Sequence, residues 1–188
     1  RSFLGNYPEL KPEKREYFFD KKVCDLGCGD GRNIPFLTQL GFKVFGIEIE
    51  KSIIDKCEDF LIFNNTKAEL FVGKNNKISF KNKFFDYLVA SHSCYYLNEN
   101  DLFSDNLNEI HRVLDESGKF IFSIPKPQNF LIDESEILDG NYAIIKNDPL
   151  KIRNGTKIKF FESKEEILKN LNDKFDHIRI GSCENNWW

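Results

Sequence analysis

Three glycines at alternate positions, Gly27, Gly29 and Gly31, are flanked by two carboxylates, Asp25 and Asp30. They follow a short apolar run and precede a helical pattern, so the sequence predicts a strand, a tight loop and a helix in succession. Bare glycine backbone and the positive end of a helix can both come close to a ligand. Asp25 would stand at the carboxyl end of the strand, where open α/β sheets bind small molecules.

The spacing of the glycines favours one kind of ligand over another. A dinucleotide fingerprint is Gly-x-Gly-x-x-Gly, in which the helix N-terminus faces a pyrophosphate. In this chain the third glycine comes one position sooner, and two neighbouring carboxylates would repel a pyrophosphate. They suit a ligand that carries a cation, such as an amino-acid ammonium group. A glycine-rich turn that merely connects strand to helix is the alternative.

Residues 23–33 resemble motif I of the class I S-adenosylmethionine-dependent methyltransferases, in which a hydrophobic pair precedes Asp-Leu-Gly-Cys-Gly-x-Gly. The resemblance implies a Rossmann-like fold, with S-adenosyl-L-methionine as cofactor and S-adenosyl-L-homocysteine as its product. It also implies that the cofactor is contacted by residues of this loop, namely Asp25, Gly27, Cys28, Gly29, Asp30 and Asn33.

The run Gly46-Ile47-Glu48-Ile49 resembles the second motif of the family, in which an acidic residue ends the second strand. Glu48 lies roughly twenty residues beyond the glycine loop, a spacing at which a carboxylate can reach a ribose. It could accept hydrogen bonds from both ribose hydroxyls, each worth about 1.5–3 kcal/mol. A surface glutamate at a strand end is the alternative.

The chain departs from the family after the third predicted strand. Many relatives read Gly-Asp-Ala there, and that Asp accepts the adenine amino group, but this chain has Lys74. A lysine cannot accept a hydrogen bond. Adenine recognition is therefore expected from Asn75 or Asn76, from backbone, or from stacking on Ile49.

Ser91 and His92 follow the fourth predicted strand, where the family places residues beside the methionine part of the cofactor. Ser91 is an expected cofactor contact. His92 is the candidate catalytic base, because imidazole titrates near neutrality, although a base is needed only if the acceptor must lose a proton. A histidine that packs on the cofactor or bonds to backbone is the alternative. No metal site is expected, because Cys24 and Cys28 have no second pair.

The elements that would position these residues alternate over the first 125 residues. Strands are predicted over residues 22–26, 43–49, 68–72, 85–90 and 119–124. Helices are predicted over residues 12–20, 32–40, from 51 onward and over 101–114. This alternation is typical of an α/β, doubly wound, mainly parallel sheet with helices on both faces.

The rhythm breaks after the fifth strand. The connection over residues 126–162 is longer than an ordinary crossover needs. Two further strands are predicted within it, over 142–146 and 157–161, and they indicate an inserted hairpin or a pair of edge strands. A helix over 163–173, begun by a capping box of Ser163 and Glu166, and a sixth strand over 177–182 follow.

The whole chain, 1–188, is interpreted as one methyltransferase domain. Residues 1–21 would form an N-terminal segment or helix, and the insertion 126–162 would cover the acceptor site. The last strand of the family, which slots between the fifth and sixth, has no counterpart. We expect either that the full protein continues beyond this chain or that residues 142–161 fill part of that place.

Composition bears on the partners. The formal net charge of −3 argues against general nucleic-acid binding, and no apolar run approaches a membrane span. With no visible signal peptide and five scattered cysteines, a cytoplasmic protein with reduced thiols is expected. The insertion is rich in basic residues, which suit an anionic acceptor unless they form a solvated surface loop: Lys146, Lys151, Arg153, Lys157 and Lys159.

The expected function is therefore methyl transfer from S-adenosylmethionine to a small-molecule acceptor, as O- or N-methylation. A catalytically inactive cofactor-binding or scaffold protein is one alternative, which Lys74 keeps open. An NAD-dependent oxidoreductase is another, which the glycine spacing and Asp25 disfavour. The acceptor and the oligomeric state are left open.

Overall fold

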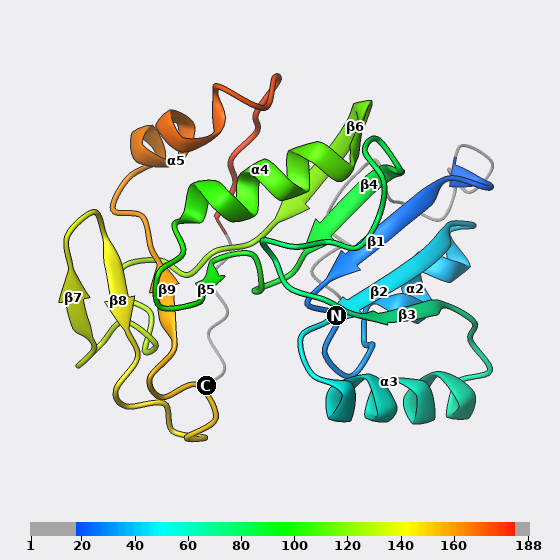
Figure 1. Cartoon of the computed structure of the whole chain (residues 1–188), viewed down its shortest axis with the longest axis horizontal. Helices are drawn as coiled ribbons and strands as arrows, with labels where there is room; N and C mark the ends of the chain where they lie inside the picture. Colours follow the sequence, from blue (N-terminus) through cyan, green and yellow to red (C-terminus); the bar gives the residue numbers. More distant parts are fainter. Residues whose placement is uncertain (1–17, 183–188) are drawn as a thin grey trace.

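The computed structural model describes residues 18–182, which form two β-sheets with helices packed around them (Figure 1). The strands of the larger sheet lie in the order β3-β2-β1-β4-β6, and every pairing is parallel. The order reverses beside β1, which makes the carboxyl ends of β1 and β4 the topological switch point of the sheet. These five strands are β1 (Lys22–Leu26), β2 (Lys43–Glu48), β3 (Glu69–Val72), β4 (Phe85–Ala90) and β6 (Leu114–Phe122).

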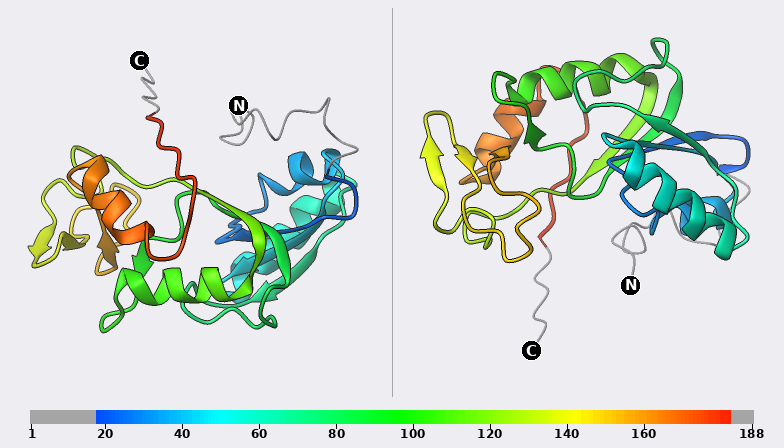
Figure 2. Two further views of the ribbon diagram at one scale, coloured as in Figure 1. Left: turned by 90° about the horizontal axis from the view of Figure 1, so that it is seen from above. Right: turned by 60° about the horizontal axis from the view of Figure 1, so that its bottom comes forward.

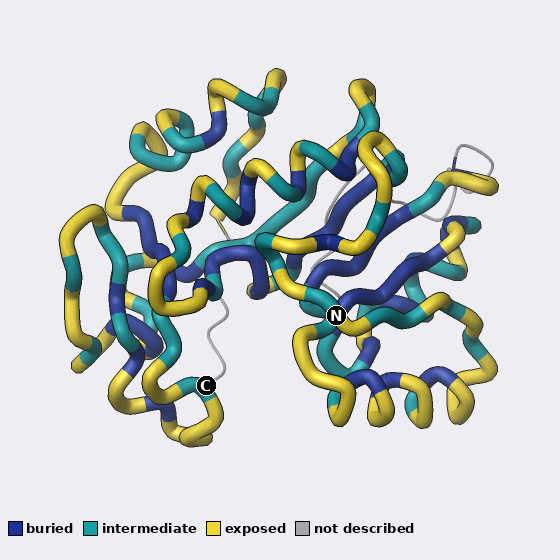
Figure 3. Tube along the Cα trace, viewed as in Figure 1, coloured by how far each residue is buried: buried dark blue, intermediate teal, exposed yellow. Residues whose placement is uncertain are grey.

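Helices cover both faces of the larger sheet, as the doubly wound interpretation predicts. These helices are α2 (Ile34–Gln39), α3 (Lys51–Phe63) and α4 (Phe103–Val113). Alternate residues of each central strand face opposite helices, because side chains of a strand point to opposite faces in turn. In β1, Val23 packs in one core cluster with α2 and α3, whereas Cys24 packs in the other with α4. Figure 3 shows the buried central strands between exposed connections.

The amphipathic pattern of α4 explains why this segment forms a helix against the sheet. Leu107, Ile110 and Val113 recur at helical spacing, and all three are buried. Burying such a side chain contributes about 1.5–3 kcal/mol. The carboxylate of Asp105 accepts a hydrogen bond from the backbone N–H of Leu102 at 2.8 Å, which satisfies a donor at the start of the helix.

A second, antiparallel sheet lies beside the larger one (Figure 1), with the order β5-β9-β8-β7. Figure 2 shows it, with α5 (Lys164–Leu171), at the opposite end of the molecule from α3. The two strands predicted in the insertion are confirmed as a pair, but two unpredicted strands flank them. The four are β5 (Tyr96–Leu97), β7 (Glu136–Leu138), β8 (Tyr142–Ile144) and β9 (Lys157–Lys159).

The start of α5 is confirmed by its cap. The hydroxyl of Ser163 accepts a hydrogen bond from the backbone N–H of Glu166 at 3.1 Å. The carboxylate of Glu166 bonds to the N–H of Glu162 rather than to that of Ser163, so the capping box is shifted by one residue. The same carboxylate pairs with the buried Lys159 at 2.5 Å, which ties α5 to β9.

Three predictions about the sheet need correction. Residues 177–182 form no strand, because they find no ladder partner among the described residues. Residues 142–161 do not take the place of a missing strand of the larger sheet, since β8 and β9 pair with each other and with β5. The fifth strand begins at Leu114 rather than 119, and residues 115–118 form an irregularity between its two paired parts. The helix over 12–20 lies largely outside the described residues.

The loop after β1 and the loop after β4 touch at the switch point. We define the β4–β5 loop as residues 91–95. A Cβ added to Gly27 would lie 2.3 Å from the Cβ of Ser93, and the φ of Gly27 is +69°. The Ser93 hydroxyl donates a hydrogen bond to the carbonyl of Leu26, so Ser93 has little freedom to move away. Glycine at position 27 is therefore required by both backbone and contact.

We predict that Gly27→Ala lowers the free energy of unfolding by about 2–5 kcal/mol, since a left-handed alanine costs roughly 1–2 kcal/mol and overpacking adds roughly 1–3. Gly29→Ala is the matched control, because its φ is +56° but nothing lies within 4 Å of the added Cβ. It should lose only the backbone part. Urea unfolding of both variants measures the difference, and equal losses would contradict the contact.

Candidate functional site

The glycine loop is fastened to the end of β2. The backbone N–H groups of Gly27 and Cys28 both donate to the carbonyl of Ile47, at 2.8 and 3.1 Å. The carboxylate of Glu48 accepts from the N–H of Gly29 at 3.0 Å and from the N–H of Ile49 at 2.7 Å. The loop and Glu48, nineteen residues apart, are therefore neighbours at the carboxyl edge of the sheet.

Asp25 is the most unusual group of this site. Its side chain is fully buried, and neither carboxylate oxygen has a hydrogen-bond partner among the described residues. Burial, opposed by a weak interaction with the Asn33 side-chain amide and aided by the negative charge of Glu48, raises the pKa of Asp25 to about 7. An unpaired buried carboxylate is costly, which marks the position as one built for a partner.

Other loop residues lie around this carboxyl with different surroundings. Asp30 is partly exposed and pairs with Arg32 at 2.9 Å. Cys28 is buried beneath the loop beside Cys57, and burial raises the pKa of the Cys57 thiol to about 11. These thiols therefore stay protonated and act as packing groups, and the four cysteines of residues 18–182 are all buried and free.

His92 lies in the β4–β5 loop, next to Ser93. Its φ is +55°, a conformation that a residue with a side chain adopts rarely and that accumulates at functional sites. The N–H of His92 donates to the hydroxyl of Ser123 at 2.9 Å, at the end of β6. The ring is exposed on one side, yet the protein around it lowers the pKa of His92 by desolvation. The imidazole is therefore neutral at pH 7 and able to accept a proton. Ser91, next to it, is partly buried.

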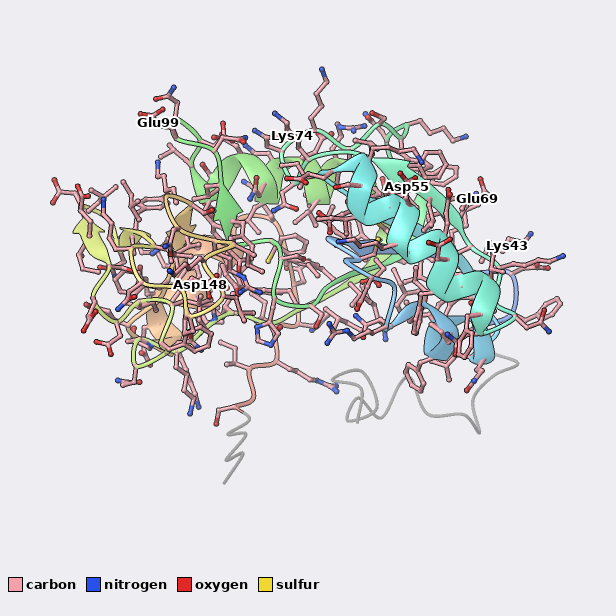
Figure 4. The ribbon with its side chains drawn as sticks, turned by 90° about the horizontal axis from the view of Figure 1, so that it is seen from below. Lys43, Asp55, Glu69, Lys74, Glu99 and Asp148 are labelled. Atoms are coloured by element: carbon pink, nitrogen blue, oxygen red, sulfur yellow. The ribbon has the colours of Figure 1, made fainter. Side chains whose placement is uncertain are left out.

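The two asparagines predicted near adenine form a tight turn after β3. The amide nitrogen of Asn75 donates to the carbonyls of Ser93 at 2.9 Å and Tyr96 at 3.2 Å. The amide nitrogen of Asn76 donates to the carboxylate of Asp101 at 2.8 Å. Lys74, exposed at the rim of the molecule in Figure 4, pairs through its backbone with Lys77 across the turn. Both amide nitrogens are thus engaged with protein.

Sequence reasoning missed two residues that hold the β4–β5 loop. Ser93 is buried against Gly27, and Asn106 of α4 is buried and donates to the carbonyls of Cys94 at 2.8 Å and Tyr96 at 3.1 Å. A polar residue on the otherwise apolar face of a predicted helix was the available signal for Asn106. Asp86, by contrast, has a structural role, since its carboxylate accepts from the N–H of Lys22 and pairs with Lys21.

Most of the positive charge of the insertion is engaged within the protein. Lys146 pairs with Glu136, Lys159 with Glu166 and Arg153 with Asp148, and Lys157 donates to two backbone carbonyls.

Asp148 lies among the loops of the smaller sheet, away from α3 (Figure 4), and it also accepts from three backbone N–H groups. Lys151 is exposed, and its backbone N–H donates to the carbonyl of Asp148 at 2.8 Å. The charges alone therefore give weak support for an anionic acceptor.

Several polar features come together at this edge of the sheet. A buried carboxylate without a partner, glycine backbone with open space at Gly29, and a carboxylate at the next strand end form one continuous site. A family model described as "Methyltransferase domain" matches residues 24–122, more than half of the chain and the whole of this site. The chain belongs to this family. The resemblance seen in residues 23–33 is confirmed, and the protein is a class I S-adenosylmethionine-dependent methyltransferase by family.

Solved structures share the fold. An S-adenosylmethionine-dependent methyltransferase from Methanosarcina mazei is 20% identical, with a TM-score of 0.73 over 96% of this chain and 91% of that one. The PH0226 protein from Pyrococcus horikoshii is 25% identical, with a TM-score of 0.65 over 89% of this chain and 82% of that one.

A curated relative is also similar in sequence. The uncharacterized protein MJ1252 from Methanocaldococcus jannaschii is 29% identical over 147 residues, which are 78% of this chain and 53% of that protein. The chain thus spans about half the length of the curated relative it matches. In residues 18–182 no helix is long and apolar enough to cross a membrane, and no three His, Cys, Asp or Glu side chains gather as for a metal.

The buried Asp25 should make stability depend on pH. Its pKa is about 7 in the folded protein and about 3.9 when unfolded, so the folded state binds more protons between these values. Stability from this residue is therefore present below about pH 4 and is lost as the pH rises to about 7. We predict that Asp25→Asn removes this loss, roughly 3–5 kcal/mol.

Urea unfolding at several pH values measures the slope for both proteins. Asp30→Asn, at a partly exposed position of the same loop, is the control and should keep the wild-type slope. An Asp25→Asn variant with the slope of the wild type would show that Asp25 titrates normally.

Proposed function

We propose that this chain transfers a methyl group from S-adenosylmethionine to a small-molecule acceptor, in the cytoplasm and without nucleic acid or membrane as partner. The observation that carries the proposal is the buried, unpartnered carboxylate of Asp25 beside the glycine loop. The ammonium of an amino-acid ligand would supply the missing counter-charge there, whereas a pyrophosphate would not. This favours the methyltransferase over the nicotinamide-dependent alternative.

The residues divide into those that hold each end of the cofactor. Asp25 and Asn33 take the amino-acid end, together with the backbone of Gly27, Cys28 and Gly29. Glu48 takes the ribose, because its carboxylate lies at the edge of the sheet and is partly exposed. Half of the Ile49 surface is exposed, which leaves an apolar side chain free to stack on adenine. Asp30, Ser91 and Asn76 complete the proposed set.

The cofactor supplies an electrophilic methyl group on a positively charged sulfur. The task of this chain is to hold the acceptor in line with that methyl, and alignment of this kind can contribute roughly 7–11 kcal/mol. The glycine loop, the end of β2 and the β4–β5 loop are cross-linked by backbone and side-chain hydrogen bonds, so they form a rigid support for such alignment. Where the acceptor must lose a proton, the neutral imidazole of His92 takes it.

The acceptor site is proposed to lie between the β4–β5 loop and the insertion 126–162. β5 follows the loop directly and pairs with β9, so the smaller sheet is joined to the side of the site where His92 lies. Arg153 is the basic residue of the insertion that best fits an anionic acceptor group, because a single 3.4 Å contact to Asp148 leaves most of its donors available. O- or N-methylation both agree with a neutral histidine.

We predict that Glu48→Ala weakens S-adenosylhomocysteine binding about 10- to 100-fold, the loss of one or two charge-assisted hydrogen bonds. Isothermal titration calorimetry measures the affinity. Glu50→Ala, two residues along and exposed before α3, is the control and should bind as the wild type does. Unchanged affinity in Glu48→Ala would remove ribose binding from this residue, and titration with NAD tests the oxidoreductase alternative.

We predict that the chain labels a component of a protein-free filtrate of small metabolites when it is supplied with methyl-labelled S-adenosylmethionine. With the labelled acceptor in hand, His92→Gln should lose about 100-fold or more in kcat while keeping its affinity for S-adenosylhomocysteine. Because the pKa of His92 is lowered, wild-type kcat should hold its full value to a pH below the ordinary histidine range and fall only as the ring protonates.

His177→Gln, an exposed histidine beyond α5, is the control for that measurement and should turn over normally. Full turnover in His92→Gln would assign the proton to another group or to solvent. Cofactor binding without any labelled product, in the filtrate or in protein and nucleic-acid fractions, would favour the inactive cofactor-binding protein.

A further inference from the structure

Asn75 joins the two halves of the site through a single side-chain nitrogen. This nitrogen donates to the carbonyl of Ser93, in the middle of the β4–β5 loop, and to the carbonyl of Tyr96, the first residue of β5. An amide nitrogen has two N–H groups, so both are engaged by these two carbonyls. The residue that stands near the adenine position of the family is therefore a donor to the opposite loop.

The turn that carries Asn75 is itself fixed to the cofactor side. The N–H of Gly73 donates to the carbonyl of Glu48 at 2.9 Å, and Lys74 and Lys77 close the turn by two backbone hydrogen bonds. A short chain of contacts thus runs from Glu48, at the end of β2, through this turn to Ser93. Each contact is a hydrogen bond of ordinary length, so the chain is short and stiff.

Asn106 holds the same loop from the side of α4 and serves as a comparison. Its amide nitrogen bonds to the carbonyls of Cys94 and Tyr96, and its side chain is 1% exposed. Among the described residues, its side chain makes no hydrogen bond to the turn after β3. Asn75 differs because it is the side chain that bonds the loop to the turn adjoining Glu48.

The position of His92 depends on this loop. His92 precedes Ser93, whose carbonyl Asn75 holds, and its own left-handed backbone must be maintained by its neighbours. The hydroxyl of Ser123 holds the N–H of His92 from the side of β6. Release of the Ser93 carbonyl would let His92 relax toward ordinary backbone angles.

We propose that Asn75 is a positioning residue that fixes the β4–β5 loop, and with it His92, relative to the cofactor end of the site. The inference rests on the proposed function for its catalytic meaning, but the hydrogen bonds that carry it belong to the protein alone. Asn75 acts as a donor to the loop, rather than as the acceptor for adenine that could replace the family's Asp at the position of Lys74.

Two substitutions separate the donor role from the acceptor role. Asn75→Asp keeps an oxygen that could accept from adenine but has no N–H for the carbonyls of Ser93 and Tyr96. Asn75→Ala removes both and adds no charge. A positioning role predicts that both variants disturb His92, whereas an adenine-acceptor role predicts that only Asn75→Ala loses cofactor affinity.

The readout is the ring of His92, followed by NMR of histidine-labelled protein. The chain has three histidines, and His92→Gln identifies the signal. In Asn75→Ala the pKa of His92 should rise toward the ordinary value of about 6.5, because the loosened loop exposes the ring. The signals of His111 and His177 should stay unchanged, which shows that the variant is folded. Asn64→Ala removes an amide that bonds only within the end of α3 and is the control.

Addition of S-adenosylhomocysteine gives the second measurement. We expect Asn75→Asp to bind it within about threefold of the wild type, yet to show a smaller change of the His92 signal on binding. A His92 titration equal to that of the wild type in both variants would overturn the positioning role. If S-adenosylhomocysteine binds to no protein, wild type included, the proposed function fails, and the ligand-free titration still decides the role of Asn75.

Discussion

The structure of the site depends on the close approach of two loops at the switch point of a parallel sheet. Parallel strands bring the carboxyl ends of β1, β2, β4 and β6 to one edge, and the reversal of order beside β1 lets the loops after β1 and β4 meet there. A glycine at position 27 makes the contact with Ser93 possible. The same contact brings the loop that carries His92 against the glycine loop, whose Gly29 bonds to Glu48, so a requirement of the fold is also a requirement of the site.

Around this contact the protein accepts an electrostatic cost. Asp25 is buried without a partner, and Glu48 adds a second negative charge nearby. Two backbone N–H groups donate to the carboxylate of Glu48, whereas neither oxygen of Asp25 accepts a hydrogen bond of ordinary geometry from the described residues. In the proposed site, the unpaired carboxylate of Asp25 suits a cation. The carboxylate of Glu48, already held by two N–H groups, suits hydroxyl donors at the edge of the sheet. This difference is the physical basis for the proposed orientation of the cofactor.

The smaller sheet adds a different kind of constraint. β5 is only two residues long, yet it carries the chain directly from the β4–β5 loop into the antiparallel sheet. Residues of that sheet share a core cluster with α4, since Ala143, Ile158 and Phe161 pack in the same cluster as Leu107. The insertion is thus packed onto the helix that also supplies Asn106.

The sequence by itself determined the parallel sheet, the glycine loop and the family. The strands over 22–26 and 85–90 and the cap at Ser163 follow from local patterns, because alternation, glycine spacing and capping act over a few residues. What tertiary structure alone decided is which residues meet. Asn75 bonds to Ser93 and Tyr96 eighteen and twenty-one residues away, and residues 177–182 find no strand partner. The engagement of the basic insertion residues and the isolation of Asp25 were decided there too. Pairing across such separations depends on the packing of whole elements, and no local pattern records it.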